Sequence, residues 1–339
     1  MNFMTGAVLV LSFLIGCLGS LATVKWGSRL SLMDLPSVRS SHSSSTPKGG
    51  GIGILAACLL FGAVLDVSFF VLIPAAGISM IGFTGDRYNI NPKIRLGLQL
   101  GAIFILLIGH AGHMIQMSGF SDAGMLIRIP GSLLAYGFWM LFIAGTANFY
   151  NFMDGINGIA AVTAIVAFLL LGTFGWVSGK NEGLVLLSFV LVFANAGFLP
   201  WNFPKAKVFM GDLGSLLLGF LFAAFVFLFT GSAAEFILMT SFLMPFYADE
   251  IITMAERIQD GEGLTRPHRR HLYQVLANEY GYEHWKVSLG YGAVQVLCGI
   301  LVWAALSFGI FWGIVTLSVF FVMFLLINRK VKPGAVSSG

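Results

Sequence analysis

The sequence has few charged residues. Asp, Glu, Lys and Arg make up 10% of the 339 residues, whereas hydrophobic residues make up 57% and the mean hydropathy is +0.88. Soluble domains carry about 25% charged residues. The scarcity of charge excludes an ordinary soluble domain, and we predict a membrane protein with several spans.

Cysteine is scarce too. The three cysteines, Cys17, Cys58 and Cys298, all lie in apolar runs. Their positions argue against a disulfide framework or a zinc site and favour a role in packing. No small-residue cleavage site is evident after the first apolar run, so we expect a retained first span rather than a cleaved signal peptide.

The sequence contains many long runs of apolar residues. About eleven runs are long enough to cross a bilayer. They lie at residues 3–24, 50–66, 67–85, 96–112, 132–149, 156–176, 183–200, 213–231, 236–255, 287–307 and 310–328. We therefore expect an all-α, polytopic helical bundle that forms one membrane domain over residues 1–330, followed by a disordered tail over 331–339.

The basic residues are distributed unevenly between the connecting loops. Of the 19 Lys and Arg residues, only Arg128 and Lys180 fall in the loops of one side. The positive-inside rule then places the N-terminus outside and the C-terminus in the cytoplasm. Nearly all polar clusters fall on the cytoplasmic side, while the longest outer connection, 113–131, is expected to form a small polar flap.

The first inner segment ends in Thr46-Pro47-Lys48-Gly49-Gly50-Gly51. Glycines that lead into a helix leave backbone N–H groups free to bind an anion, and Lys48 would add a positive charge. The alternative is a flexible loop that enters the next span tightly.

The second inner segment starts with Gly85-Asp86-Arg87, and Lys93 and Arg95 follow. Asp86 would lie at the inner end of a span. It is either part of a site or an interfacial cap with arginine partners.

The third segment carries Asn148, Asn151, Asp154 and Asn157 at three-residue intervals between two apolar runs. Side chains three residues apart are neighbours on a helix surface, so these groups could converge on one site. Ionisable groups beside membrane spans are costly, which favours a functional site over a simple polar turn.

The fourth segment, Phe209-Met210-Gly211-Asp212-Leu213-Gly214-Ser215, places Asp212 at the start of a span. The helix dipole would stabilise a carboxylate there, so capping is one explanation. The other is a divalent cation, because Mg²⁺ commonly takes one or two protein carboxylates and leaves its other positions to water and phosphate.

The fifth segment, Arg266-Pro267-His268-Arg269-Arg270-His271, is strongly basic. Arginine binds phosphate in fork geometry. The alternative is a solvated loop that meets anionic lipid headgroups. Acids for Mg²⁺ and bases for phosphate on one face of a membrane bundle predict phosphoryl transfer from a soluble nucleotide donor to a lipid.

With these motifs the chain resembles the polyprenyl-phosphate N-acetylhexosamine-1-phosphate transferases of glycosyltransferase family 4. The phospho-MurNAc-pentapeptide translocase belongs to the same superfamily. The most specific pieces are residues 151–158 and 209–215. Within the family, the chain is most similar to enzymes that initiate O-antigen with 6-deoxy HexNAc donors such as UDP-N-acetylfucosamine.

The resemblance implies a role for each residue. Asp212 would bind Mg²⁺, with Mn²⁺ as a substitute, and Asp154 would lie at the reaction centre and share the metal. Asp86 would act as the base for the lipid phosphate. The expected substrate contacts, with Phe209 stacking on uracil, are Lys48, Arg95, Asn148, Asn151, Asn157, Phe209, His268, Arg269 and His271.

Two positions depart from the family pattern. Gly85 stands where the family usually has a first acid before the Asp-Arg pair, and Asn157 stands where it usually has an acid after Asp-Gly-x. A mechanism that needs either carboxylate cannot apply unchanged. The phospho-MurNAc-pentapeptide translocases also carry three adjacent histidines, which this sequence lacks. Their absence argues against the peptidoglycan precursor as the sugar-phosphate donor.

The expected reaction transfers HexNAc-1-phosphate from a UDP-HexNAc to undecaprenyl phosphate in the bacterial inner membrane. Membrane lipids are expected neighbours, no nucleic-acid partner is expected, and homodimer formation stays open. The rival is a transporter or flippase for an anionic lipid or nucleotide sugar. A transporter would place polar residues near the bilayer midplane, whereas here they crowd one face.

Overall fold

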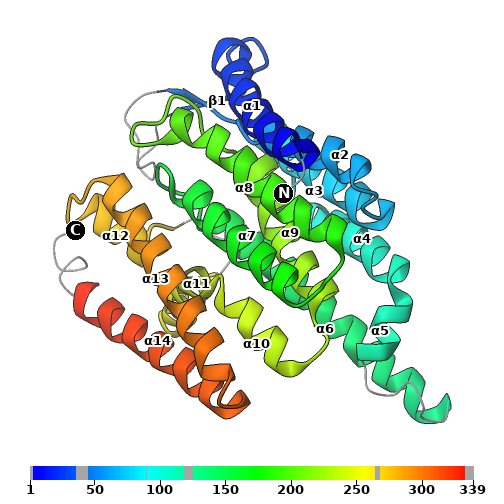
Figure 1. Ribbon diagram of the computed structural model, residues 1–339. Helices are drawn as coiled ribbons and strands as arrows, with labels where there is room; N and C mark the ends of the chain where they lie inside the picture. Colours follow the sequence, from blue (N-terminus) through cyan, green and yellow to red (C-terminus); the bar gives the residue numbers. More distant parts are fainter. Residues whose placement is uncertain (1–2, 36–44, 89, 118–124, 264–267, 333–339) are drawn as a thin grey trace.

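The structure, a computed structural model, describes residues 3–35, 45–88, 90–117, 125–263 and 268–332. Within these residues the chain forms fourteen α-helices and one short two-stranded sheet (Figure 1). The helices of the first half are α1 (Phe3–Trp26), α2 (Ile52–Val64), α3 (Phe69–Tyr88), α4 (Pro92–Gly109), α5 (Ala111–Met117), α6 (Met125–Phe152) and α7 (Ile159–Val177).

The second half continues in the same way. Its helices are α8 (Glu182–Asn202), α9 (Asp212–Phe229), α10 (Ala233–Ser241), α11 (Met244–Gln259), α12 (Leu272–Asn278), α13 (His284–Leu306) and α14 (Ile310–Val331). Nine of the described helices are long and apolar enough to cross a membrane, and there are ten spans if one bent pair counts as one. This confirms the expected all-α polytopic fold.

Two of the eleven expected spans are not single helices long enough to cross a membrane. Residues 50–66 contain only the 13-residue helix α2. At 1.5 Å per residue it is about 20 Å long, shorter than the roughly 30 Å hydrocarbon core. The expected span 236–255 is broken into α10 and α11, which meet at 83°. Pro245, in the first turn of α11, explains the break because proline cannot continue a preceding helix.

Two further expectations concern the ends of spans. The outer connection 113–131 is partly helical, since α5 ends at Met117 and α6 begins at Met125; residues 118–124 lie outside the described residues. The tail does not begin at Val331. Helix α14 reaches that residue, and the next one, Lys332, is buried and donates to Glu256 and Thr253. Residues 333–339 lie outside the described residues.

Helix α9 occupies the centre of the bundle. Almost every residue from Leu213 to Phe229 is buried, and α3, α6 and α7 pack around the helix. Gly219 permits the close approach of α6, because a Cβ at this position would collide with Tyr150 and Ala147. Since α9 begins at Asp212, the most buried helix of the protein carries a carboxylate at one end.

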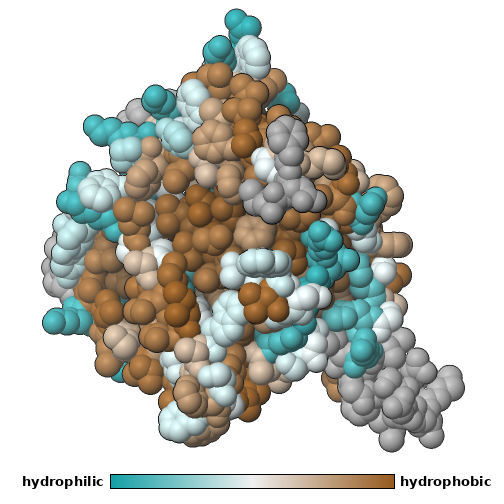
Figure 2. All heavy atoms as spheres, in the orientation of Figure 1, coloured by the Kyte–Doolittle hydropathy of each residue, from teal (hydrophilic) through white to brown (hydrophobic). Residues whose placement is uncertain are grey.

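The surface has the character expected of a membrane protein. Figure 2 shows a face covered mainly by hydrophobic side chains over α7, α8, α13 and α14, with hydrophilic side chains gathered near β1 and α12 and again near the opposite ends of the helices. Exposed residues on α14, among them Phe311, Val319 and Leu326, contribute to this apolar face. The chain is thus a multi-pass membrane protein.

The short sheet fixes the loop before α2. Strands β1 (Met33–Asp34) and β2 (Thr46–Pro47) are antiparallel, and Asp34 pairs with Thr46. Directly after β2, Lys48 forms a parallel bridge with Phe209. The N–H of Phe209 donates to Pro47, and the N–H of Gly50 donates to Phe209. These bonds hold the lysine beside the start of α9.

Candidate active site

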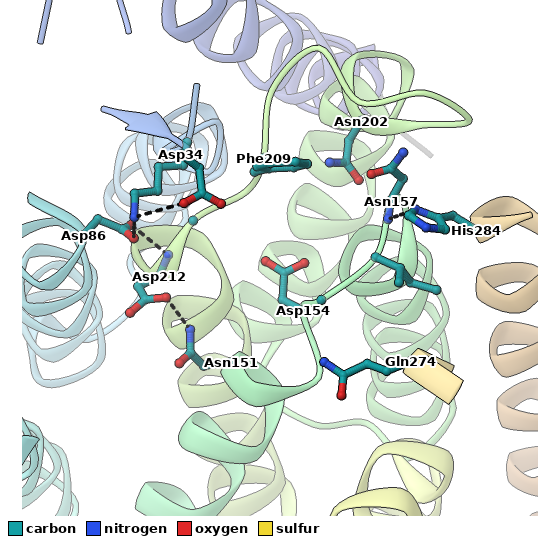
Figure 3. Close-up of a pocket in the computed structure, with 14 residues that line it drawn as sticks. Asp34, Asp86, Asn151, Asp154, Asn157, Asn202, Phe209, Asp212, Gln274 and His284 are labelled. Carbon is teal, nitrogen blue, oxygen red and sulfur yellow. Dashed lines mark hydrogen bonds and ion pairs between the residues drawn. The ribbon is translucent and has the colours of Figure 1, made fainter. Parts of the chain in front are cut away.

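A polar cavity of about 260 Å³ opens where the ends of α3, α6, α9 and α13 meet the loop before α2. Its walls carry acids, amides, a lysine and two rings (Figure 3). The lining residues are Asp34, Lys48, Asp86, Asn151, Asp154, Gly155, Ile156, Asn157, Asn202, Phe209, Gly211, Asp212, Gln274 and His284. Seven of the residues expected from the sequence therefore share one cavity.

Asp86, in the last turn of α3, joins two other elements. One carboxylate oxygen lies 3.3 Å from Lys48 Nζ, and the other accepts the backbone N–H of Asp212 at 2.9 Å. The Asp86 side chain is only 6% exposed. Gly211 has a φ of +74°, and a Cβ there would lie 2.8 Å from Asp86, so this approach requires glycine.

Asp212 is held by two further helices. Its Oδ2 pairs with Arg95 of α4 at 2.7 Å, and its Oδ1 accepts a hydrogen bond from Asn151 of α6 at 2.8 Å. Arg95 also donates to the side-chain oxygen of Asn151 at 3.2 Å. The three residues form a closed polar triangle, in which Arg95 acts through Asp212 rather than lining the cavity itself.

Asp154 follows the end of α6 and lies between the other carboxylates and the amide groups (Figure 3). In the described part of the chain, its carboxylate has no hydrogen-bond or ion-pair partner. Burial, and then the nearby carboxylates of Asp212 and Asp86, raise the pKa of Asp154 to about 7. Asp154 is thus the acid of this cavity that is most available for chemistry.

The turn around Asp154 is supported from α12. Tyr273 Oη donates to the carbonyl of Phe152 at 3.1 Å. A Cβ at Gly155 would collide with the Tyr273 hydroxyl, so the glycine lets this ring approach. The position of the tyrosine thereby contributes to the position of Asp154.

Amides and rings form the other side of the cavity. Asn202 Oδ1 accepts the N–H of Gly158 at 2.6 Å, which orders the chain after Asn157. Asn157 N–H donates to His284 Nδ1 at 3.3 Å. Figure 3 shows Asn157, Asn202 and His284 grouped on the side away from Asp86, with Phe209 beside them.

Besides Arg95, four expected substrate contacts do not line the cavity. These are Asn148, His268, Arg269 and His271. The side-chain nitrogen of Asn148 on α6 donates a hydrogen bond to Gln99 of α4 at 2.8 Å, so this amide already has a protein partner. Arg266 of the same basic segment lies outside the described residues.

His271 differs most from its expected role. The side chain is only 2% exposed, and its ring nitrogens face Asp249 at 3.8 Å and Glu250 at 3.4 Å. Burial, with the positive charges of His271 and Arg257 as further causes, lowers the pKa of His268 to about 4. Neither His268 nor His271 lines the cavity, and their phosphate contacts stay predictions.

Sequence motifs missed other members of the site. Asp34, Asn202, Gln274 and His284 line the cavity, yet they were not expected as site residues. Asp34 precedes the Thr46–Gly51 loop, and Gln274 follows the basic segment 266–271 by three residues. Asn202 and His284 are single polar residues at the ends of apolar runs, a weak signal that could nevertheless have marked them.

The donor set suits an oxygen-preferring cation. Within the described residues, no group of three or more His, Cys, Asp or Glu side chains is placed to hold a metal ion. Mg²⁺ needs only one or two carboxylates, and Asp154 and Asp212 face the same cavity. Four carboxylates line the cavity, and among the described residues Lys48 pairs with Asp86 and Arg95 pairs with Asp212, so a cation would lower the remaining negative charge.

The fold and site define a multi-pass membrane protein with an acidic polar cavity at one end of its helices. Comparison with known proteins agrees. The model of glycosyl transferase family 4 matches residues 68–230, from the start of α3 to the end of α9. The family resemblance expected from the sequence is confirmed.

Individual relatives fall in the same superfamily. The chain is 27% identical to the probable undecaprenyl-phosphate N-acetylglucosaminyl 1-phosphate transferase of Bacillus subtilis, over 90% of this chain and 88% of that protein. It is 27% identical to the decaprenyl-phosphate N-acetylglucosaminephosphotransferase of Mycobacterium leprae, over 89% and 81%.

A relative with a differently named substrate matches too. The phospho-N-acetylmuramoyl-pentapeptide-transferase of Geobacillus thermodenitrificans is 28% identical over 76% of this chain and 83% of its own length. All three relatives bear the names of phosphotransferases. The expectation of an enzyme that transfers a sugar phosphate is confirmed at this level.

Proposed function

We propose that this protein transfers HexNAc-1-phosphate from a UDP-HexNAc to a polyprenyl phosphate, with undecaprenyl phosphate as the acceptor, and releases UMP. The observation that carries the proposal is the cavity in which Asp154 and Asp212 lie beside Lys48 and the Arg95 pair. The relatives named above act on polyprenyl phosphates, which supports the acceptor class.

The reaction exchanges one phosphoanhydride for another. An oxygen of the lipid phosphate attacks the β-phosphorus of the donor, the bond from that phosphorus to the bridging oxygen breaks, and UMP leaves. Mg²⁺, when bound at Asp154 and Asp212, would neutralise charge on the donor diphosphate. Lys48, which lines the cavity, would oppose the repulsion between the two anionic substrates, while Arg95 holds Asp212 in place.

The two expected catalytic carboxylates differ in what they can do. Asp86 already accepts bonds from Lys48 and the N–H of Asp212, so we assign it to positioning these groups. Within the described residues Asp154 has no such partner, and it faces the cavity, so we assign it the reaction centre. We favour direct attack by the lipid phosphate; the alternative is a covalent phospho-sugar on Asp154.

A separate apolar groove supports the lipid acceptor. A cavity of about 420 Å³ lies along α6, α10, α11 and α14, lined by residues such as Phe142, Phe149, Tyr247 and Phe321. Phe149 is two residues from Asn151, which lines the polar cavity. A prenyl chain in this groove would bring its phosphate toward Asp154.

The donor sugar is the finer part of the proposal. We propose a 6-deoxy HexNAc such as N-acetylfucosamine, with the enzyme starting O-antigen synthesis in the bacterial inner membrane. The support is the resemblance of the sequence as a whole to enzymes that initiate O-antigen. GlcNAc is the second donor to test because two relatives are named for it.

The decisive experiment measures UMP release by detergent-purified protein with undecaprenyl phosphate and a panel of UDP-HexNAc donors. We expect release that requires lipid and one donor, that EDTA abolishes, that Mg²⁺ or Mn²⁺ restores, and that is lost in Asp154→Asn. Donor binding without turnover by any of the UDP-HexNAc donors would instead support a transporter. A labelled sugar phosphate trapped on the protein without lipid would favour the covalent route.

A further inference from the structure

A second apolar groove, of about 540 Å³, lies between α12, α13 and α14. Among the described residues, none that lines it also lines the polar cavity or the groove along α6. Figure 1 shows α13 and α14 at the edge of the bundle. Leu297, Met323 and Ile327 line the groove and are each about half exposed. The groove therefore opens sideways, toward the lipid.

The length of the groove fits one leaflet of a bilayer. Along α13 its lining runs from Lys286 to Leu297, which is about 16 Å at 1.5 Å per residue. Half of a hydrocarbon core of roughly 30 Å is about 15 Å. The helix α14 packs antiparallel to α13 and lines the groove from Ile327 back to Phe320. One acyl chain of a phospholipid would extend along this distance.

The groove is basic at one end. Lys286, in the first turn of α13, and Tyr282, just before that helix, line it there. Lys286 pairs with Glu283 at 2.7 Å, but both side chains are more than half exposed, and such a surface pair is weak enough to be exchanged for another anion. On α14, the exposed Lys330 follows the lining residue Ile327 by three positions, so it extends the same helix face past the groove.

The inner wall of the groove belongs to the network that supports the reaction turn. Tyr291 lines the groove, and its hydroxyl donates to Asp249 at 2.7 Å. Leu272, another lining residue, donates its backbone N–H to the same carboxylate at 2.8 Å. The next residue, Tyr273, supports the turn before Asp154. A molecule in the groove would therefore stabilise the packing of α12 against α13.

We propose that this groove binds a phospholipid with a net negative charge, with one acyl chain between α13 and α14 and the phosphate at Lys286. The basic end attracts an anionic headgroup more strongly than a zwitterionic one, which brings a positive group of its own. An undecaprenyl chain is much longer than one acyl chain and than this groove. The lipid site is thus distinct from the acceptor groove along α6, and it does not depend on the proposed reaction.

The test titrates the full-length purified protein with phosphatidylglycerol and, for comparison, with zwitterionic phosphatidylcholine, and counts bound lipid by native mass spectrometry. Gly290 lines the groove, and a Cβ there would meet no atom within 4 Å, so Gly290→Leu fills the groove without a clash. It should lower phosphatidylglycerol affinity at least about 10-fold, because contact with two methylene groups is already worth that factor. Gly101→Leu, at an equally open position on α4 outside the cavities described, is the matched control and should bind as the wild type does.

A second variant tests the charge of the groove. Lys286→Ala should lower phosphatidylglycerol affinity about fivefold, the effect of one basic residue at a membrane surface, and leave phosphatidylcholine affinity unchanged. The side chain is exposed, so its removal leaves the packing of the bundle intact. Lys25→Ala, at the exposed end of α1, is the matched control and should change neither affinity.

Three outcomes would overturn the proposal. One is wild-type affinity for phosphatidylglycerol in both Gly290→Leu and Lys286→Ala. Another is displacement of phosphatidylglycerol by an equal concentration of undecaprenyl phosphate, which would make the groove a second acceptor site. The third is loss of a dimer in Gly290→Leu, which would make it a contact between two copies of the chain. Each is measured without a sugar donor, so the result is independent of whether the protein releases UMP.

Discussion

At the residue scale, the three central carboxylates differ in their partners. Asp86 holds Lys48 and the first N–H of α9, and Asp212 is held by Arg95 and Asn151. Asp154 faces the cavity without a protein partner in the described part of the chain. Three chemically identical carboxylates can therefore have different roles, because burial and charged neighbours determine which of them ionises most readily.

Asp212→Asn should lower UMP release at least about 100-fold, the scale of loss when a preorganised electrostatic group is removed. The amide would lose the charge that pairs with Arg95 and that suits a cation. Initial rates across a Mg²⁺ titration provide the measurement. Wild-type rates in this variant would remove Asp212 from the site.

The pKa of Asp154 predicts how pH affects stability of the metal-free protein. With a pKa near 7 in the folded state, Asp154 keeps its proton while the unfolded chain releases it near the ordinary value of 3.8. The folded state thus binds more protons between about pH 4 and 7, and stability falls as pH rises through this range.

Asp154→Asn should remove this dependence. In EDTA, its melting temperature should rise relative to wild type as the pH is increased from 5 to 8. Thermal melting of both proteins in detergent over that range is the measurement. If the difference between the two melting temperatures does not change with pH, Asp154 does not have the raised pKa expected from its burial.

At the scale of elements, α12 links the buried interior to the reaction turn. Asp249 of α11 accepts the N–H groups of Leu272 and Tyr273 at 2.8 and 3.4 Å, and the hydroxyl of Tyr291 at 2.7 Å. A carboxylate at the start of a helix satisfies free N–H groups and interacts well with the dipole. Tyr273 then contacts the backbone at Phe152, two residues before Asp154.

Asp249→Asn should therefore affect both stability and rate. An amide leaves part of this buried hydrogen-bond network unsatisfied, at a cost of about 1–3 kcal/mol. We expect a lower melting temperature and a lower kcat, with little change in the KM for the donor. Tyr280→Phe, which removes one exposed hydroxyl contact to Val331, is the control. Equal melting temperatures for Asp249→Asn and wild type would contradict the anchoring role.

At the scale of the whole molecule, the position of the cavity determines which side of the membrane its substrates reach it from. It lies at one end of the helices, close to the loops that hold nearly all the Lys and Arg residues. If the positive-inside rule holds, the cavity opens to the cytoplasm, where nucleotide sugars are made available, and the loop at Lys180 faces outward.

Cysteine labelling would test this orientation. In intact cells, a membrane-impermeant maleimide should label Glu182→Cys, at the exposed start of α8, and should reach Glu279→Cys only after the cells are lysed. The natural cysteines Cys17, Cys58 and Cys298 lie in helices within the bundle and provide the background reading. The reverse labelling pattern would invert the topology.

Periodicity and composition predicted much of the fold, because an apolar run of spanning length has few alternatives to a helix. They did not predict the break between α10 and α11 at Pro245 or the short α2. In both places local backbone constraints and packing, rather than hydropathy, determine where a helix ends. Asp86, Asp154 and Asp212 were predictable because each acid stands out at the end of an apolar run.

The sequence by itself determined that the chain is an all-α membrane bundle with its acids and bases at the helix ends of one side. Only the tertiary structure decided which of these groups meet. It brought His284 and Asn202 into the cavity, turned His271 toward buried acids, and left the Asp154 carboxylate without a hydrogen-bond or ion-pair partner among the described residues. The physical reason is that hydropathy is a local property, whereas a cavity forms from helix ends distant in sequence, whose approach is decided by packing around α9.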